Sequence, residues 1–458
     1  MTTTDHTDES CESAFDRMRG SAMARALGLI GLILLLQVPI EMISSTINER
    51  SARRNEAITD VTRTWGHRQE VRGPFLVVPY VMRIEEPGRP VREEWSARYL
   101  LPSTLTVDGA LDATVRRRGI FDVPLYVGTL SVQGSFQLPE ASAFPAEATV
   151  VQWDHALLAV AISDPKSIRE NVTLDWDGHT IGLEPGLVGF NMYETGLSAR
   201  LPLDASVAGT TVPFSMALSL AGSDGLSVLP VGDDTTVRLR SGWADPSFDG
   251  AYPPVERTVT PAGFTATWRV LRLARSFPSS WRRGELCRKD LDGSLLGVSL
   301  LSPVDAYRTT DRAVKYQLLF VGLTFVTFFL FELLGGLRVH PIQYLLVGLA
   351  LCLFYLLLLS LAEHVGFDLA YGAASLAIAA LVTSYSRAVL RDRRGVGVIA
   401  GLTSGLYAYL YVLLQIQDYA LLVGSIGLFA ILAAVMWLTR RVDWYALRLD
   451  TRPASSVA

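Results

Sequence analysis

The sequence predicts a membrane protein: an α-helical bundle of six transmembrane helices, with a large all-β extracytoplasmic domain, antiparallel and sandwich-like, inserted between helices 1 and 2. Hydrophobic residues make up 50% of the 458 residues, too high a fraction for an ordinary soluble protein. They gather in separate runs of membrane-spanning length rather than spreading along the chain. The long segment between the first two runs instead alternates apolar and polar residues with a period of two, as half-buried antiparallel strands do.

The expected transmembrane helices divide the chain into regions. A polar N-terminus, 1–22, precedes the first span at 23–43, and a helical stalk at 44–71 leads into the β-rich domain at 72–311. The remaining regions are a bundle at 312–438, with spans at 316–337, 341–361, 367–385, 396–414 and 419–438, and a tail at 439–458. A cleaved signal peptide is the alternative for the first span, but its apolar run is longer than such peptides carry and no A-x-A site follows it.

Arginines in the short loops predict the orientation of the bundle. One set of loops and ends is rich in arginine: Arg17, Arg19, Arg25, Arg387, Arg391, Arg393, Arg394, Arg440, Arg441 and Arg448. The opposite short loops, "LAEHVGFD" and "QIQDY", contain no Lys or Arg. By the positive-inside rule, both termini are expected in the cytoplasm and the β-rich domain outside it. Cys11, Cys287 and Cys352 would then lie in three different compartments, so no intrachain disulfide is expected.

Alternating runs and turn signals predict the β-rich domain. "FSMALSLAG" and "TVRLRSGW" are two of about 12 expected short strands, arranged as one sandwich or as two packed modules. Two Asp-Gly pairs, Asp108-Gly109 and Asp177-Gly178, lie between alternating runs. Because Asp-Gly tolerates the positive φ angles of a type I′ turn, a hairpin is predicted at each pair.

Charged and ionisable residues gather at the ends of the predicted spans and not at mid-depth. The outer-face group is Asp311, Arg312, Lys315, Glu363 and His364, and the inner-face group is Glu332, Arg338 and His340. One interpretation is that these groups anchor helix ends and pair locally, with His340 capping the helix that begins at Pro341. The other interpretation is a ligand or proton site at one of the two faces.

Sequence motifs for catalysis, metal binding or nucleotide binding are absent. The six histidines form neither H-x-x-x-H nor H-E-x-x-H, and no G-x-S-x-G or P-loop occurs. The small residues of "GVGVIAG" at Gly395–Gly401 are interpreted as a helix–helix contact. A net charge of −4 favours no nucleic-acid partner. No catalytic residue, metal or cofactor is therefore predicted, and the chain is not expected to be an enzyme.

Several stretches, among them "VTRTWGHRQEVRGPFLVVPY", "SVLPVGDDTTVRLRSGWADPSFDG", "SPVDAYRTTDRAVKYQLLFVGLTFVTFFLFE" and "TRRVDWYAL", resemble the inner-membrane protein CreD family. The resemblance runs from about Gly28 to Leu447. It implies a bacterial inner-membrane protein with a large periplasmic region, tied to a two-component regulon that responds to carbon source. It also implies links to envelope integrity, colicin tolerance and the response to β-lactams. The family supplies no catalytic residue or cofactor to carry over.

Three functions follow as hypotheses, and no oligomeric state is predicted. The first is a non-enzymatic protein of envelope integrity and envelope stress, embedded in the lipid bilayer, whose periplasmic β-domain binds an envelope protein, glycan or lipid. The second is a small transporter or lipid-handling protein, although the spans carry almost no charge at mid-depth. The third is a membrane-embedded enzyme acting on envelope material, with Asp305, Asp311, Glu363 and His364 as its best residues.

Overall fold

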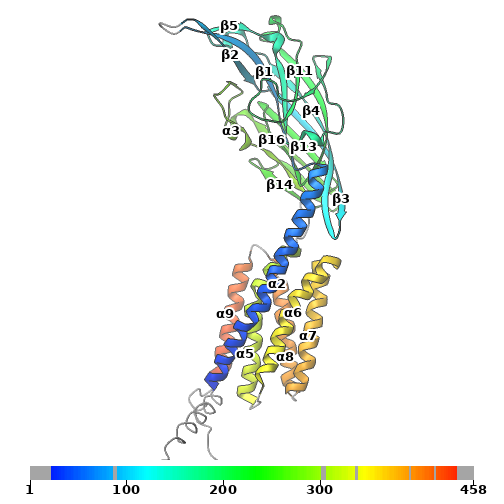
Figure 1. Ribbon diagram of the computed structural model, residues 1–458, viewed down its shortest axis with the longest axis vertical. Helices are drawn as coiled ribbons and strands as arrows, with labels where there is room; N and C mark the ends of the chain where they lie inside the picture. Colours follow the sequence, from blue (N-terminus) through cyan, green and yellow to red (C-terminus); the bar gives the residue numbers. More distant parts are fainter. Residues whose placement is uncertain are drawn as a thin grey trace, which may run out of the picture. The chain divides into compact units, whose positions relative to one another are not determined.

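The computed structural model describes residues 22–85, 90–300, 306–335, 339–390, 393–416 and 419–440. The chain divides into two compact units (Figure 1). The membrane unit combines Met1–Arg53 with Val304–Ala458, and the β unit is Arg54–Pro303. An N-terminal helix, a large β region of two sheets and C-terminal helices follow in this order, which confirms the predicted fold class. The predicted terminal segments 1–22 and 439–458 lie almost wholly outside the described residues.

The membrane unit is built from long apolar helices and one short, charged helix of ten residues. They are α2 (Ala22–Trp65), α4 (Ala306–Lys315), α5 (Gln317–Gly335), α6 (Pro341–Val365), α7 (Phe367–Leu390), α8 (Arg393–Gln415) and α9 (Ala420–Thr439). Among the described residues, five helices are long and apolar enough to cross a membrane. The pair α4–α5, bent by 42°, brings the count to as many as six. Leucine and phenylalanine side chains such as Leu421 and Phe429 of α9 stay exposed, as lipid-facing residues should.

Local chemistry explains where α6 begins and ends. His340 caps the helix: its ring Nδ1 accepts a hydrogen bond from the Ile342 amide at 3.3 Å, while its own amide donates to the Gln343 side chain at 3.0 Å. Pro341 occupies the first turn, where a missing amide costs little. The predicted cap at His340 is therefore confirmed. Gly366, with φ of 81°, ends the helix in a conformation that favours glycine.

Aromatic packing and one close approach hold the membrane helices together. The ring of Tyr407 on α8 contacts Phe354 of α6 and Phe320 of α5, with centroids 4.6 and 5.8 Å apart. Gly348 of α6 lies so close to α2 that a Cβ there would collide with the Leu36 side chain. The first helix is therefore packed against the bundle and does not cross the membrane alone.

Sheet A is the larger of the two sheets in the β unit. Its ten strands are β1 (Gln69–Ile84), β2 (Arg92–Leu100), β5 (Ala148–Val151), β6 (Leu157–Ile162), β9 (Glu184–Pro185), β10 (Gly196–Arg200), β12 (Gly225–Val228), β14 (Pro246–Gly250), β17 (Ser280–Arg282) and β18 (Leu296–Leu300). The order is β14-β18-β12-β1-β6-β10-β9, with β2 and β5 also pairing with β1, and β17 with β2. The short helix α3 (Arg288–Asp292) precedes β18.

Sheet B has eight strands in the order β15-β16-β13-β3-β4-β11-β7-β8. They are β3 (Thr104–Arg118), β4 (Phe121–Gln137), β7 (Thr173–Trp176), β8 (His179–Gly182), β11 (Thr211–Ser223), β13 (Asp234–Ser241), β15 (Glu256–Thr260) and β16 (Gly263–Leu271). Burial alternates along β11 and β13, with one face in the core and the other toward solvent. Buried residues from both sheets, such as Phe75 and Trp268, belong to one continuous core, so the β unit is a single module.

The two predicted hairpin turns have different outcomes. Asp177-Gly178 joins β7 to β8 with φ angles of 51° and 81°, which confirms the turn. The prediction of a hairpin turn at Asp108-Gly109 was wrong, because β3 continues without a break through these two residues. A Cβ at Gly109 would come within 2.6 Å of the Leu239 side chain, so glycine at this position lets that side chain pack closely against β3. The hairpin turns ten residues later at Gly119, where φ is 63°.

The end of α2 is fixed to the β unit through Trp65. Its indole N–H donates to the Tyr126 carbonyl at 3.3 Å. The guanidinium groups of Arg116 and Arg169 lie 4.4 and 4.6 Å from the ring centre. Cation–π contacts of this kind each contribute about 0.5–1 kcal/mol at partly exposed sites. The predicted helical stalk is a continuation of the first membrane helix, but it ends at Trp65 and not at residue 71, since β1 already begins at Gln69.

Candidate functional sites

A charged network in the β unit is centred on Asp292, the last residue of α3. Its Oδ1 accepts hydrogen bonds from Arg72 Nε and from the Tyr193 hydroxyl, both at 2.9 Å. Its Oδ2 accepts from Arg288 Nε, also at 2.9 Å. The Arg72 side chain is 5% exposed and also pairs with Glu70, so its buried charge is balanced by two carboxylates. The network ties α3 to the first strand of sheet A.

The same contacts fix the protonation states of the network. Partial burial of Asp292 opposes ionisation, but the hydrogen bonds and charges of Arg288 and Arg72 outweigh it and lower the pKa of this carboxyl. Burial, together with the neighbouring Asp292 charge, raises the pKa of Tyr193 well above its ordinary value. A carboxylate that stays ionised and a phenol that stays neutral do not exchange a proton near pH 7. The arrangement is that of a structural ion pair and not of an acid–base couple.

In the membrane unit, Glu332 of α5 forms the first triad with Arg25 and Tyr344. Its Oε1 accepts from Arg25 Nη1 at 2.9 Å, and its Oε2 accepts from the Tyr344 hydroxyl at 3.0 Å. The Glu332 side chain is only 5% exposed. The predicted partners were therefore wrong in one respect: His340 is exposed and serves as the α6 cap. Arg338 lies outside the described residues.

Glu363 of α6 forms the second triad with Tyr307 and Arg50. The Tyr307 hydroxyl donates to Glu363 Oε1 at 2.9 Å, and Arg50 Nε lies 3.9 Å from the same oxygen. The Glu363 side chain is 10% exposed. Tyr307 and Arg50 come from α4 and α2, so this triad joins three helices.

The other residues predicted beside Glu363 make different contacts. Lys315 pairs with Asp311 at 2.8 Å, four residues away on α4. The ring Nδ1 of His364 lies 3.0 Å from the Ser360 carbonyl oxygen of its own helix. Arg312 is half-buried on α4. The described contacts therefore do not unite the predicted outer-face group, and Asp305 lies outside the described residues.

The two triads have the same composition, and both link α2 to the other membrane helices. Each holds a nearly buried glutamate between an arginine of α2 and a tyrosine of another helix. Between them along α2, Gln37 accepts a hydrogen bond from the Gln317 side chain of α5 at 2.7 Å. Charge-assisted and amide hydrogen bonds of this kind stabilise helix contacts where water is scarce. A polar residue inside the first apolar run, Gln37, was the available sequence signal for these contacts.

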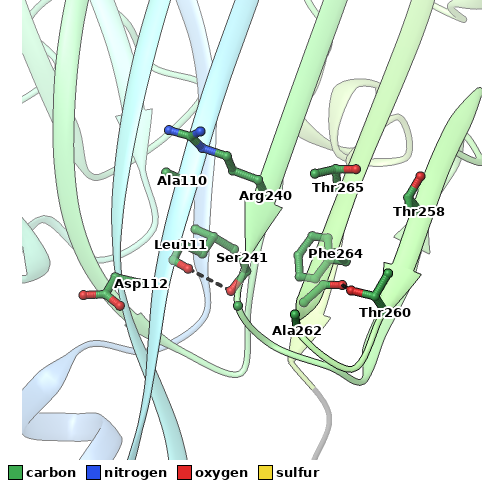
Figure 2. Close-up of a pocket in the computed structure, with 12 residues that line it drawn as sticks. Ala110, Leu111, Asp112, Arg240, Ser241, Thr258, Thr260, Ala262, Phe264 and Thr265 are labelled. Carbon is green, nitrogen blue, oxygen red and sulfur yellow. Dashed lines mark hydrogen bonds between the residues drawn. The ribbon is translucent and has the colours of Figure 1, made fainter.

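The outer face of sheet B carries two shallow hollows that were not predicted. The first has a volume of about 460 Å³. Figure 2 shows that Arg240, Thr265 and Thr258, which line it, lie on neighbouring strands. The second, of about 470 Å³, is lined by Thr104, Thr106, Gln133, Gly134, Asp175, Pro213, Phe214 and Ser215. The linings mix hydroxyl and amide side chains with apolar ones such as Phe264 and Phe214, and with the charged Asp112, Arg240 and Asp175. The hydroxyls and the amide can donate and accept hydrogen bonds.

Metal ligands do not gather in the described part of the chain, where no group of three or more His, Cys, Asp or Glu side chains is placed to hold an ion. Of the three cysteines, Cys287 is an exposed free thiol of the β unit, and Cys352 is a buried free thiol of α6. Cys11 lies outside the described residues.

These features define a class: multi-pass membrane proteins with a large β unit inserted after the first helix. The family model described as Inner membrane protein CreD matches residues 21–445. The chain is 33% identical over 438 residues to the Inner membrane protein CreD of Escherichia coli (strain K12), covering 93% of this chain and 94% of that relative. The chain belongs to the CreD family and is a multi-pass inner-membrane protein.

Proposed function

We propose that this chain is a non-enzymatic protein of the cell envelope. Its β unit would face the periplasm and bind an envelope component, and its membrane unit would hold that unit at the inner membrane. Through this contact it would support envelope integrity and the response to envelope stress. The observation that carries the proposal is the β unit itself: a single packed module of two sheets, inserted between membrane helices, with a broad polar face open to solvent.

The expected orientation is supported by charge at the helix ends. Arg387 near the end of α7 and Arg393 and Arg394 at the start of α8 belong to the arginine-rich side. The short turn between α6 and α7 carries Glu363 and Asp368 and no Lys or Arg. The positive-inside rule then gives both termini to the cytoplasm and the β unit to the periplasm.

A binding role is favoured over catalysis because the candidate catalytic groups are held in ion pairs and helix contacts. Glu363 accepts from Tyr307, and Asp311 pairs with Lys315. Asp292 accepts three hydrogen bonds, and its pKa is lowered rather than raised toward neutrality. A general acid or base instead needs a pKa near the working pH and access to substrate.

The test compares two versions of the chain in cells that lack it. One is the full chain, and in the other a flexible Gly/Ser linker replaces Arg54–Pro303. The measurement is sensitivity to detergent and to β-lactams at matched protein levels in the membrane. We expect only the full chain to restore resistance. Equal protection by the linker version would show that the membrane unit acts alone, and it would contradict the proposal.

A small transporter or lipid-handling protein remains the second candidate, because of three buried hydroxyls. Thr324 of α5, Tyr355 of α6 and Thr403 of α8 are almost fully buried, and their hydroxyl oxygens make no hydrogen bond within the described residues. Buried polar groups of this kind commonly bind water or a ligand. Scrambling of labelled phospholipid in vesicles that contain the full chain would favour this function. The envelope-binding proposal predicts no scrambling above that of protein-free vesicles.

A further inference from the structure

We propose that the outer face of sheet B binds the uncharged sugar backbone of a carbohydrate chain, the glycan strands of the cell wall. This inference rests on the proposed function and deepens it, because it names the envelope component. The register of the strands places outward-facing side chains in rows across the sheet. One row crosses six neighbouring strands through Ser219, Thr129, Ala110, Arg240, Thr265 and Thr258.

The next rows repeat this pattern. In the second row, Ser131 lies opposite Asp108, which lies opposite Arg238. The third row places Ser215, Gln133, Thr106 and Thr236 on consecutive positions of β11, β4, β3 and β13. The residues between these positions, including Leu130 and Val237, point into the core. Because the pattern has a period of two, the core holds nearly all the apolar side chains, and the outer face consists chiefly of hydroxyls and amides.

Charge along these three rows is balanced. Along the three rows the charged side chains are three arginines and three acids: Arg238, Arg240, Arg269, Asp108, Asp175 and Glu256. Arg238 and Asp108 neutralise each other across neighbouring strands at 3.1 Å. An anionic polymer or an anionic lipid surface would be recognised by excess positive charge, which these rows lack. A neutral polymer is the charge-complementary partner.

The rows also lack the large apolar side chains on which protein–protein interfaces are centred. No apolar side chain larger than alanine occurs in them, whereas protein interfaces centre on buried aromatic and aliphatic residues. A carbohydrate, in contrast, presents hydroxyls that both donate and accept, and serine, threonine and glutamine match them. Six strands about 4.8 Å apart give a row of roughly 24 Å, long enough for several sugars. The hollow near Thr258 (Figure 2) and the second hollow near Thr106 offer recesses along it.

The experiment uses the full chain purified in detergent and two probes: intact cell-wall sacculi, and linear oligomers of N-acetylglucosamine, an uncharged chain with the same kind of amino-sugar backbone. The test variant combines Thr106→Val, Thr129→Val and Thr265→Val, which removes three hydroxyls and keeps strand propensity. Its matched control combines Thr59→Val, Thr64→Val and Thr149→Val, three exposed threonines of α2 and sheet A. We expect the wild type and the control to bind both probes. The test variant should bind at least about tenfold more weakly, since each neutral hydrogen bond lost weakens binding severalfold.

Two results would overturn the inference: no binding of the neutral oligomers by the wild type, whether or not sacculi bind, or full binding by a folded test variant. A Ser131→Arg variant adds bulk and charge at the centre of the face and must also weaken binding, which guards against misfolding of the triple variant. If the glycan probes do not bind but the linker version still does not protect cells, the glycan inference is wrong and the proposed function stands. If the linker version protects cells as well as the full chain, both the proposed function and the glycan inference are wrong.

Discussion

At the scale of single residues, Asp292 supports the strongest stability prediction. Asp292→Asn removes a carboxylate that accepts from Arg72, Tyr193 and Arg288, and it leaves the Arg72 charge buried with Glu70 as its remaining acid. We expect the free energy of unfolding of the β unit to fall by about 1–3 kcal/mol. Thermal unfolding of the full chain, followed by tryptophan fluorescence, measures this. Asp112→Asn, at an exposed aspartate of β3, is the control and should change little.

Asp292 also gives the stability a pH dependence of known sign. The pKa of Asp292 is lowered in the folded state, so its stabilising effect is complete above the unfolded-state pKa of about 3.9. That effect disappears as pH falls through the lower, folded-state pKa. The stability difference between wild type and Asp292→Asn should therefore be constant from pH 7 to about 5 and shrink below about 4. A difference that grew in acid would contradict the ionised network.

The two triads are predicted to differ in strength. Glu332 lies 2.9 Å from Arg25 and is less exposed, whereas Glu363 lies 3.9 Å from Arg50. Double-mutant cycles with Arg→Met and Glu→Ala, measured by thermal stability in detergent, should give a coupling of about 0.5–2 kcal/mol for the first pair and less for the second. Glu363→Gln alone should leave expression intact. Equal couplings would mean that burial and distance do not control these contacts.

At the scale of elements, glycines decide which strands can lie together. Gly134 of β4 is packed so closely that a Cβ would collide with the Thr104 carbonyl of β3. Gly134→Ala should lower the free energy of unfolding by about 1–3 kcal/mol or more. Gly182→Ala is the matched control, because Gly182 of β8 has no atom within 4 Å of the added Cβ. Chemical denaturation of the full chain compares them, and equal losses would reject the packing argument.

The elements also indicate what the sequence could predict. Apolar runs of spanning length and period-two alternation depend only on local solvent exposure, so both the membrane helices and the β region were found. The turn predicted at Asp108-Gly109 was wrong because Gly109 packs against Leu239, a residue distant in sequence. The prediction for Glu332 missed Arg25 for the same reason: Arg25 is 307 residues away, whereas the expected neighbour His340 is close in sequence. Local patterns therefore predict elements, whereas pairings between distant residues require the fold.

At the level of the full chain, one helix, α2, belongs to both units. Polar contacts at Arg25, Gln37 and Arg50 hold α2 to the membrane helices, and Trp65 ends it on sheet B. The helix α2 therefore connects the two units as one continuous element. The proposed function depends most on one claim, that the β unit lies in the periplasm.

Labelling of Cys287 tests that claim most directly. Cys287 is an exposed free thiol of the β unit, whereas Cys352 is buried in α6 and Cys11 is expected in the cytoplasm. A maleimide that cannot cross the membrane should modify the full chain in intact spheroplasts, and Cys287→Ser should abolish the modification. Labelling of Cys287 only after the spheroplasts are lysed would place the β unit in the cytoplasm and contradict the account.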